Sequence, residues 1–160
     1  MNAMRRPGGA LAAMLLAAAV LGCGPDPGGF LPVAIGDAAT FRSEVEPLLE
    51  ERCANPSCHA GADRPLEIYA PLRHRLNPDN IFVDEPISDE ELTLNQQRAA
   101  CFINDLDHGS SLARKPLPIE EGGVGHAGGI IFPRGDDPAY LPLRAWVDAT
   151  AAASVQGAQP

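Results

Sequence analysis

Apolar side chains recur at the three- and four-residue steps of an amphipathic helix in the segment 40–52. The stripe consists of Phe41, Val45, Leu48 and Leu49. Thr40 has a hydroxyl that can cap the start of this helix. Pro47 lies inside the segment and lacks a backbone donor. We therefore expect the helix to bend or split at this residue.

Two further segments predict helices. The segment 88–103 opens with Ser88 and Glu91, which have the spacing of a capping box. Its apolar side is supplied by Leu92, Ala99, Phe102 and Ile103. The third helix begins at Asp137-Pro138, a capping residue followed by proline at the first helical position, and ends near Ala149. Its apolar residues are Tyr140, Leu143, Trp146 and Val147.

The connections between these helices, 60–87 and 104–136, are long and contain glycine and proline. They show little of the alternation typical of strands, although short strands over 66–69 and 130–132 stay open. Connections of this length in a compact domain are usually functional. The pattern as a whole predicts a mainly α fold: a small helical domain with long irregular loops.

The first 22 residues have the pattern of an export signal. Arg5 and Arg6 precede an uncharged apolar run over 10–21, which is shorter than the roughly 20 residues of a membrane span. The ending Val20-Leu21-Gly22-Cys23 resembles the bacterial lipobox. The resemblance implies that Cys23 is lipidated and ties the mature protein to a membrane facing the periplasm. In some bacteria an Asp directly after the lipidated cysteine retains a lipoprotein in the inner membrane. Gly24 occupies this position here, which favours the outer membrane. The alternative is an ordinary signal peptide that contains an incidental cysteine.

Composition divides the rest of the chain. The segment 23–36 is rich in proline and glycine, which predicts a tether without packing partners. We expect the folded domain over 37–149 and a flexible tail over 150–160. Without Arg5 and Arg6, 10 basic residues face 21 acidic ones, a net charge of −11. Such a charge argues against a nucleic-acid partner. The core is modest, so the domain would benefit from a cofactor or a crosslink.

The most informative local motif is Cys53-x4-Cys58-His59, directly after the first predicted helix. The usual motif for covalent haem attachment is C-x-x-C-H, in which the adjoining histidine binds the iron. Here four residues separate the cysteines. Both thiols can still reach one porphyrin edge if the intervening residues bulge outward, and Asn55-Pro56-Ser57 are turn-forming residues.

Around this motif the chain resembles the cytochrome c-like domains of bacterial exported lipoproteins, over about 41–147. The resemblance is carried by Phe41-x3-Val45-x-Pro47-Leu48-Leu49, by Ser111-Leu112-Ala113-Arg114-Lys115-Pro116-Leu117 and by Gly122-Gly123-x2-His126-x-Gly128-Gly129, followed by Phe132, Asp137, Tyr140, Leu143 and Trp146. It implies one covalent haem c, held by Cys53, Cys58 and His59. It also implies electron transfer with no substrate chemistry, and therefore no enzyme activity. The four-residue spacing departs from the family's usual motif.

The sixth iron ligand cannot be methionine, because the three methionines all lie in the leader. We favour His126, since its flanking glycines allow close approach to a flat macrocycle and match the resemblance. The pair with His59 would then be bis-histidine, with a lower potential than a His/Met site. His108, His74 and an open position remain alternatives. The cations Arg114 and Lys115 could pair with haem propionates or be ordinary surface charge.

Cys101 leaves other functions open. A haem-free interaction module could be stapled by a disulfide from Cys53 or Cys58 to Cys101. A zinc site could use these two cysteines with His59 and either His126 or Cys101, although zinc sites usually show a second close ligand pair. A Cys/His hydrolase lacks a third orienting group. The sequence does not identify a redox partner protein.

Overall fold

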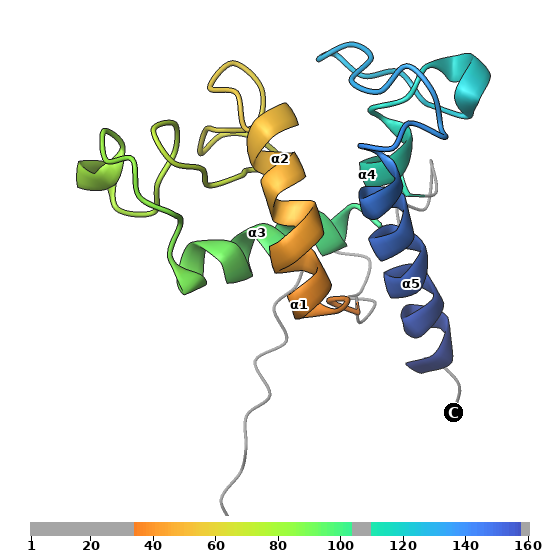
Figure 1. Ribbon diagram of the computed structural model, residues 1–160, viewed down its shortest axis with the longest axis horizontal. Coiled ribbons are helices and arrows are strands. Elements are labelled where there is room, and N and C mark those ends of the chain that lie inside the picture. Colours follow the sequence, from red (N-terminus) through yellow and green to blue (C-terminus); the bar gives the residue numbers. More distant parts are fainter. Residues whose placement is uncertain (1–33, 104–109, 158–160) are drawn as a thin grey trace, which may run out of the picture.

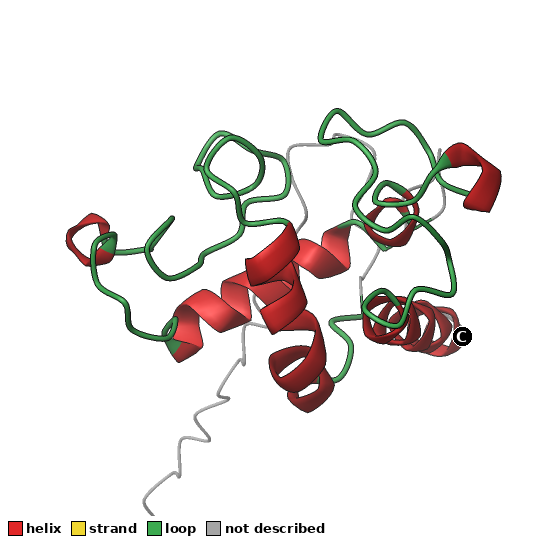
Figure 2. Ribbon diagram, turned by 45° about the horizontal axis from the view of Figure 1, so that its top comes forward, coloured by secondary structure: helices red, strands yellow, loops and turns green. Residues whose placement is uncertain are grey.

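The computed structural model describes residues 34–103 and 110–157. Helices joined by long loops make up this part of the chain, and the mainly α prediction is confirmed. Figure 2 shows the loops gathered along one side of the helices. The strands left open over 66–69 and 130–132 do not form in the described ranges, which contain one isolated bridge between Ala70 and His74. No helix among these residues combines the length and apolarity needed to cross a bilayer.

The first rod of the fold consists of α1 (Ala38–Thr40), a π-helical turn η1 (Phe41–Val45) and α2 (Glu46–Arg52). The irregularity expected near Pro47 is present as the π-helical turn, which ends at Val45, two residues before Pro47; Pro47 has no N–H to continue the regular ladder. The predicted cap is wrong. The Asp37 carboxylate accepts from the Thr40 backbone N–H at 2.7 Å, so the helix begins earlier and Thr40 lies inside it.

The second long helix, α3 (Asp89–Cys101), has both hydrogen bonds of the predicted capping box. The Glu91 side chain also reaches the loop before it, where it accepts from the Arg75 guanidinium at 3.0 and 3.1 Å and from the Leu76 N–H at 2.7 Å. Arg75 continues to the carbonyls of Glu85 and Pro86. This buried pair fixes the loop that contains the short helix η2 (Pro78–Asn80) against α3.

Two short helices interrupt the second long connection: α4 (Ser111–Arg114) and η3 (Ile119–Glu121). The last helix, α5 (Leu141–Gly157), begins after a turn in which the Tyr140 N–H binds the Asp137 carbonyl at 2.9 Å. Its predicted end near Ala149 is wrong. The alanines that follow are strong helix formers, and Thr150 is buried, so the predicted flexible tail is helical as far as 157.

The start of the domain also differs from the prediction. Residues 34–36, assigned to a tether without partners, lie against α3 and α5. Gln96 donates to the Ile35 carbonyl at 2.8 Å, and the Ala34 N–H donates to Ser154 at 3.4 Å. These contacts make the end of the tether part of the folded unit. The lipidation residue Cys23 and the rest of the tether lie outside the described residues.

Aromatic side chains fix α5 to the rest of the fold. Trp146 packs on Phe41 with ring centroids 5.1 Å apart, and the Tyr140 hydroxyl donates to the Ala113 carbonyl at 3.0 Å. Phe132 packs on Tyr140 at 5.3 Å. In Figure 1, α5 therefore stands beside both the first rod and α4. The ends of α2, α3 and α4 line a common pocket next to these contacts.

Candidate functional site

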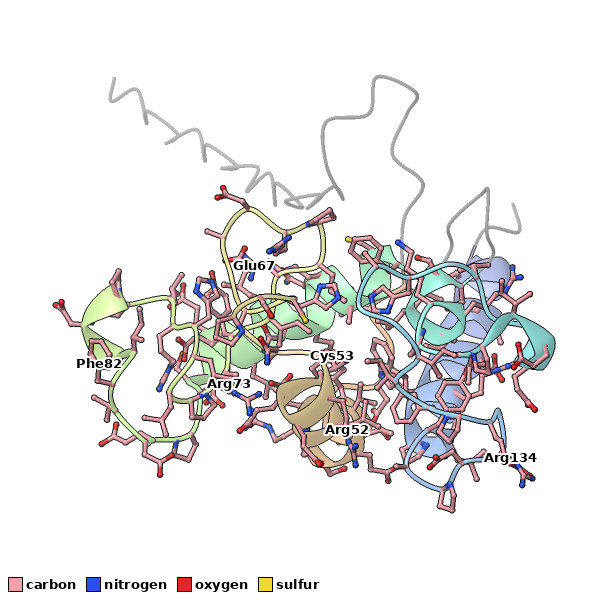
Figure 3. The ribbon with its side chains drawn as sticks, turned by 90° about the horizontal axis from the view of Figure 1, so that it is seen from above. Arg52, Cys53, Glu67, Arg73, Phe82 and Arg134 are labelled. Carbon is pink, nitrogen blue, oxygen red and sulfur yellow. The ribbon has the colours of Figure 1, made fainter. Side chains whose placement is uncertain are left out.

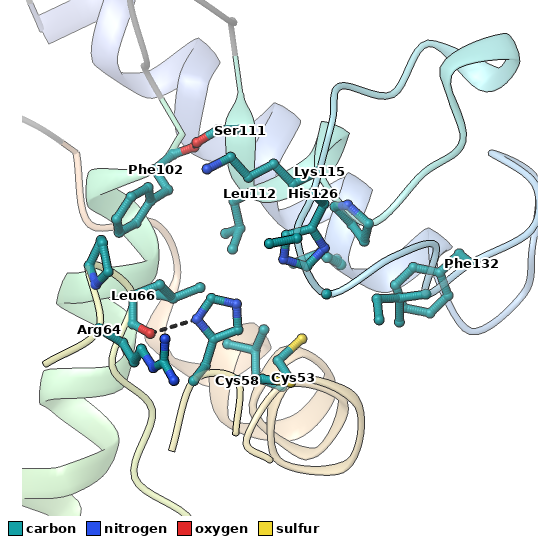
Figure 4. A pocket seen from close by; sticks show the side chains of 18 of the residues that line it. Cys53, Cys58, Arg64, Leu66, Phe102, Ser111, Leu112, Lys115, His126 and Phe132 are labelled. Atoms are coloured by element: carbon teal, nitrogen blue, oxygen red, sulfur yellow. Dashed lines mark hydrogen bonds between the residues drawn. The ribbon is translucent and has the colours of Figure 1, made fainter. Parts of the chain in front are cut away.

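A pocket of about 470 Å³ opens where the ends of the helices meet the loops. Figure 4 shows it from close by. Apolar side chains supply much of its lining: Leu49, Leu66, Phe102, Leu112, Ile131, Phe132 and Leu143. Its volume lies within the usual range for cofactor and small-molecule sites. The same pocket is also lined by Cys53, Cys58, His59, Lys115 and His126, so segments distant in sequence meet at one place.

Three of the four residues between the two cysteines turn outward, as predicted, whereas Ala54 is buried in the core. Asn55, Pro56 and Ser57 are exposed, while Cys53 and Cys58 line the pocket. The turn is fixed by the Asn55 side chain, which accepts from the Ser57 N–H at 2.9 Å and from its hydroxyl at 2.7 Å. The Asn55 carbonyl accepts from the Cys58 N–H at 2.8 Å. The four-residue spacing therefore leaves both thiols on one wall.

Arg73 supports this wall from the side. Its guanidinium donates to the carbonyls of Glu50 and Ala54, at the C-terminal end of α2. A cation at this end of a helix satisfies free carbonyls and complements the helix dipole. Figure 3 shows Arg73 beside Cys53 near the middle of the molecule, with Phe82 and Arg134 at opposite ends.

His59 is held with one ring nitrogen buried against the backbone. Its Nδ1 lies 2.8 Å from the Leu66 carbonyl, the contact drawn as a dashed line in Figure 4. A carbonyl can only accept, so Nδ1 carries the proton and Nε2 is left with its lone pair. Burial lowers the pKa of His59, and the nearby His126, Arg64 and Lys115 lower it further against the effect of the Leu66 bond. The ring is therefore neutral near pH 7, the form in which imidazole binds a metal.

His126 is held in the same way from the other side of the pocket. Its Nδ1 lies 3.2 Å from the Gly129 carbonyl, which again places a proton on Nδ1. A methyl group built on Gly128 would lie 2.9 Å from Cε1 of the ring, closer than real side chains allow. The glycine predicted to permit close approach thus makes room for the imidazole itself.

The two imidazoles face each other across the pocket. Their ring centroids are 6.0 Å apart and their planes differ by 14°. Two histidines that bind one metal ion from opposite sides, with metal–nitrogen bonds of roughly 2 Å, have ring centroids roughly 6 Å apart. The centroid separation of His59 and His126 is close to this value.

The Cys53 thiol has the properties of a buried thiol rather than of a nucleophile. Burial, and to a lesser extent the neighbouring Cys58, raises its pKa to about 12. Catalytic cysteines need the opposite shift. The environment of Cys53 thus does not favour the hydrolase alternative.

Two cations line the pocket, one predicted and one missed. Lys115 is at the end of α4, and Arg64 comes from the loop after the cysteine motif, where it also donates to the Ser57 carbonyl at 3.2 Å. Arg114 does not line the pocket; its Nε donates to the Gly122 carbonyl at 2.9 Å. The sequence offered one signal for Arg64, its closeness to the motif.

Other sequence candidates lie elsewhere. The His74 Nε2 is 2.6 Å from the Glu67 carboxylate, and its ring stacks on Tyr69 with centroids 4.9 Å apart, outside the pocket. His108 is outside the described residues. Both Cys53 and Cys58 have free thiols, so neither is joined to Cys101 at the end of α3.

No group of three or more histidine, cysteine or acidic side chains is placed to hold a metal ion in the ranges 34–103 and 110–157. The predicted zinc arrangement is therefore not assembled there. No protein family, no curated protein and no solved structure matches this chain. The proposal that follows rests on the residues of the pocket.

Proposed function

We propose that this protein is a membrane-tethered c-type cytochrome domain that transfers electrons through one covalently bound haem c. One observation carries the proposal: the imidazoles of His59 and His126 line the same pocket with ring centroids 6.0 Å apart, and Nδ1 of each ring lies beside a backbone carbonyl. Two thiols line that pocket beside them.

The residues of the pocket fit the chemistry of a haem. A porphyrin needs an apolar slot, two thiols near its vinyl groups, axial nitrogen ligands and cations for its propionates. The lining provides apolar side chains, Cys53 and Cys58, two imidazoles, and the cations Arg64 and Lys115.

Each residue has a distinct role in this proposal. Cys53 and Cys58 would form the two thioether bonds. His59, oriented by the Leu66 carbonyl, and His126, oriented by the Gly129 carbonyl, would hold the iron. A hydrogen bond to Nδ1 of this kind fixes the ring and raises its basicity as a ligand.

The bound haem supplies a reversible one-electron couple at iron. The chain's contribution is to exclude water with the apolar lining and to set the axial ligands. With no methionine outside the leader, a bis-histidine pair holds the potential below that of His/Met cytochromes. The lipid on Cys23 keeps the domain at a membrane surface. The acidic mature chain favours a redox partner with a basic docking surface.

The test is to produce the full chain in a bacterial host that expresses the cytochrome c maturation system. We expect a red protein whose pigment stays with the polypeptide in acid–acetone. One haem per chain should be found by the pyridine haemochrome assay, and the mass should increase by one haem. A variant with both Cys53→Ser and Cys58→Ser should lose its pigment to the solvent.

Axial ligation is tested by His126→Ala, with His74→Ala as the matched control for loss of an imidazole outside the pocket. We expect the absorption and electron-paramagnetic-resonance spectra to change only in the His126 variant. A colourless wild-type protein from cells in which a known c-type cytochrome matures would refute the proposed function.

A further inference from the structure

The two histidines of the pocket are held with unequal strength. His59 directly follows Cys58, its own carbonyl accepts from the Ile68 N–H at 2.8 Å, and its ring is tied to the Leu66 carbonyl. Three independent restraints from two segments therefore fix it. The His126 ring makes its hydrogen bond, at 3.2 Å, to Gly129 of the same short loop.

The loop that carries His126 is attached to the fold only at its ends. We call residues 125–130 the flap. On one side the Val124 N–H binds the Arg114 carbonyl at 3.2 Å, and on the other the Ile131 and Phe132 N–H groups bind the Pro116 carbonyl at 2.9 and 3.0 Å.

Between these attachment points the flap makes no hydrogen bond to another part of the described chain. Its internal backbone bond runs from the Gly129 N–H to the His126 carbonyl at 2.9 Å. Its large apolar side chain, Ile130, is 62% exposed. Opening the flap therefore breaks no backbone hydrogen bond to the body of the protein and exposes little additional apolar surface.

We propose that the flap opens to withdraw His126 from the iron, and that a small uncharged ligand of the carbon monoxide or nitric oxide class then binds in its place. The step is a ligand exchange. The bond from Nε2 to the iron breaks and a lone pair of the incoming molecule forms the new bond, with no change of oxidation state. This inference rests on the proposed haem, and it adds ligand binding to electron transfer.

The lining determines the class of ligand. The residues around the flap that face the pocket include Ala127, Ile131 and Phe132, which offer no hydrogen-bonding side chain. A neutral diatomic molecule loses little hydration against these side chains. A cation would lose its hydration there and would also be repelled by Arg64 and Lys115, which line the same pocket. His59 keeps the opposite side of the iron occupied throughout.

The flap contains a matched pair of glycines for the test. A methyl group on Gly128 would meet Cε1 of His126 at 2.9 Å and Nε2 at 3.3 Å, so Gly128→Ala pushes the ring from its place. A methyl group on Gly125 meets nothing within 4 Å, so Gly125→Ala adds the same group without contact. The two variants separate displacement of the ring from a general stiffening of the flap.

The experiment mixes purified, dithionite-reduced holoprotein with carbon monoxide in a stopped-flow spectrometer. For the wild type we expect the rate to level off as carbon monoxide increases, because departure of His126 becomes limiting. Gly128→Ala should raise this plateau by about tenfold, and Gly125→Ala should leave it unchanged. In His126→Ala the rate should rise linearly with carbon monoxide and show no plateau.

Haem content is measured in every sample by the pyridine haemochrome assay. A red wild-type protein that forms no carbon monoxide complex, while His126→Ala forms one, would overturn the flap and leave the cytochrome proposal intact. Equal plateaus for Gly125→Ala and Gly128→Ala would also overturn it. Absence of haem would instead refute the proposed function, and with it this inference.

Discussion

Glu46 is a buried carboxylate whose ionisation works against folding. It is 5% exposed, and its Oε1 accepts from the Asn95 amide at 3.0 Å, while its Oε2 is buried without a hydrogen-bond partner. Burial raises the pKa of Glu46 to about 7, against a lowering by the Asn95 bond and with a further increase from Glu50. The folded protein therefore prefers the protonated acid.

The sign and size of the effect follow from this shift. Between pH 4.5 and 7 the unfolded chain has lost the proton of Glu46 and the folded chain retains it. Folding then binds a proton, so the free energy of unfolding falls as pH rises through this window. At 1.36 kcal/mol for each unit of pKa, the loss is about 3 kcal/mol above pH 7.

Glu46→Gln removes the ionisation and keeps the shape of the side chain. We expect the variant to be less stable than the wild type by about 1 kcal/mol at pH 4.5, since its amide protons stay partly unpaired, and more stable by about 2 kcal/mol at pH 8.5. Urea unfolding of the holoprotein at both pH values measures the difference. Glu51→Gln, at an exposed position of the same helix, is the control. If Glu46→Gln and wild type keep the same difference at the two pH values, the assigned pKa is wrong.

Three further substitutions test the packing. Burial would raise the pKa of Glu91, but its hydrogen bonds outweigh burial and lower the pKa to about 2. The resulting stability is present above pH 4.5 and is lost as pH falls toward 2, so Glu91→Gln should cost about 3 kcal/mol in urea unfolding at pH 7 and much less at pH 2. Tyr140→Phe removes the buried hydroxyl that donates to Ala113 and should cost about 1 kcal/mol in the same assay. Gly123→Ala places a methyl group 2.1 Å from the Leu117 carbonyl oxygen and should lower the thermal midpoint of unfolding by several degrees. In the control Gly61→Ala the methyl group has no atom within 4 Å, so the midpoint should stay unchanged. Equal midpoints for the two variants would contradict this packing.

The predictions from sequence were accurate where the cause is local. The capping box of Ser88 and Glu91 depends on residues three apart, and the break near Pro47 on one missing N–H. Both are present in the structure. The cap at Asp37 was missed because Thr40 is an equally good capping residue by type. Only the helical geometry before Phe41 decides between them.

Longer-range features could not be read from the pattern. The helix α4 has four residues, too few to show a helical period, and is fixed by the Tyr140 hydroxyl from the turn before α5. The end of α5 was predicted too early because small polar residues suggest a tail. Its continuation depends on burial of Thr150 among residues from the start of the chain, which include Gly36.

The residues of the candidate site likewise fall into those that a local motif predicts and those that depend on distant contacts. Cys53, Cys58 and His59 follow from one local motif, and the outward turn between the cysteines follows from the residues in it. His126 is favoured over the other histidines by its flanking glycines and by the resemblance, and neither argument gives its position in space. Leu66 supplies the backbone group that orients His59, and no side-chain pattern could reveal a carbonyl.

The position of His126 depends on how the second long connection folds over α4. A methyl group on Gly123 would lie 2.1 Å from the Leu117 carbonyl, so the chain can pass this point only without a side chain. The next residue binds the Arg114 carbonyl, and Pro116 receives the chain when it returns. These contacts determine where the flap begins and ends, and hence that it spans the pocket opposite His59. These contacts hold the two ends of the flap and place the His126 ring centroid 6.0 Å from that of His59. They do not hold the middle of the flap, which is the basis of the proposal that His126 can move away from the pocket.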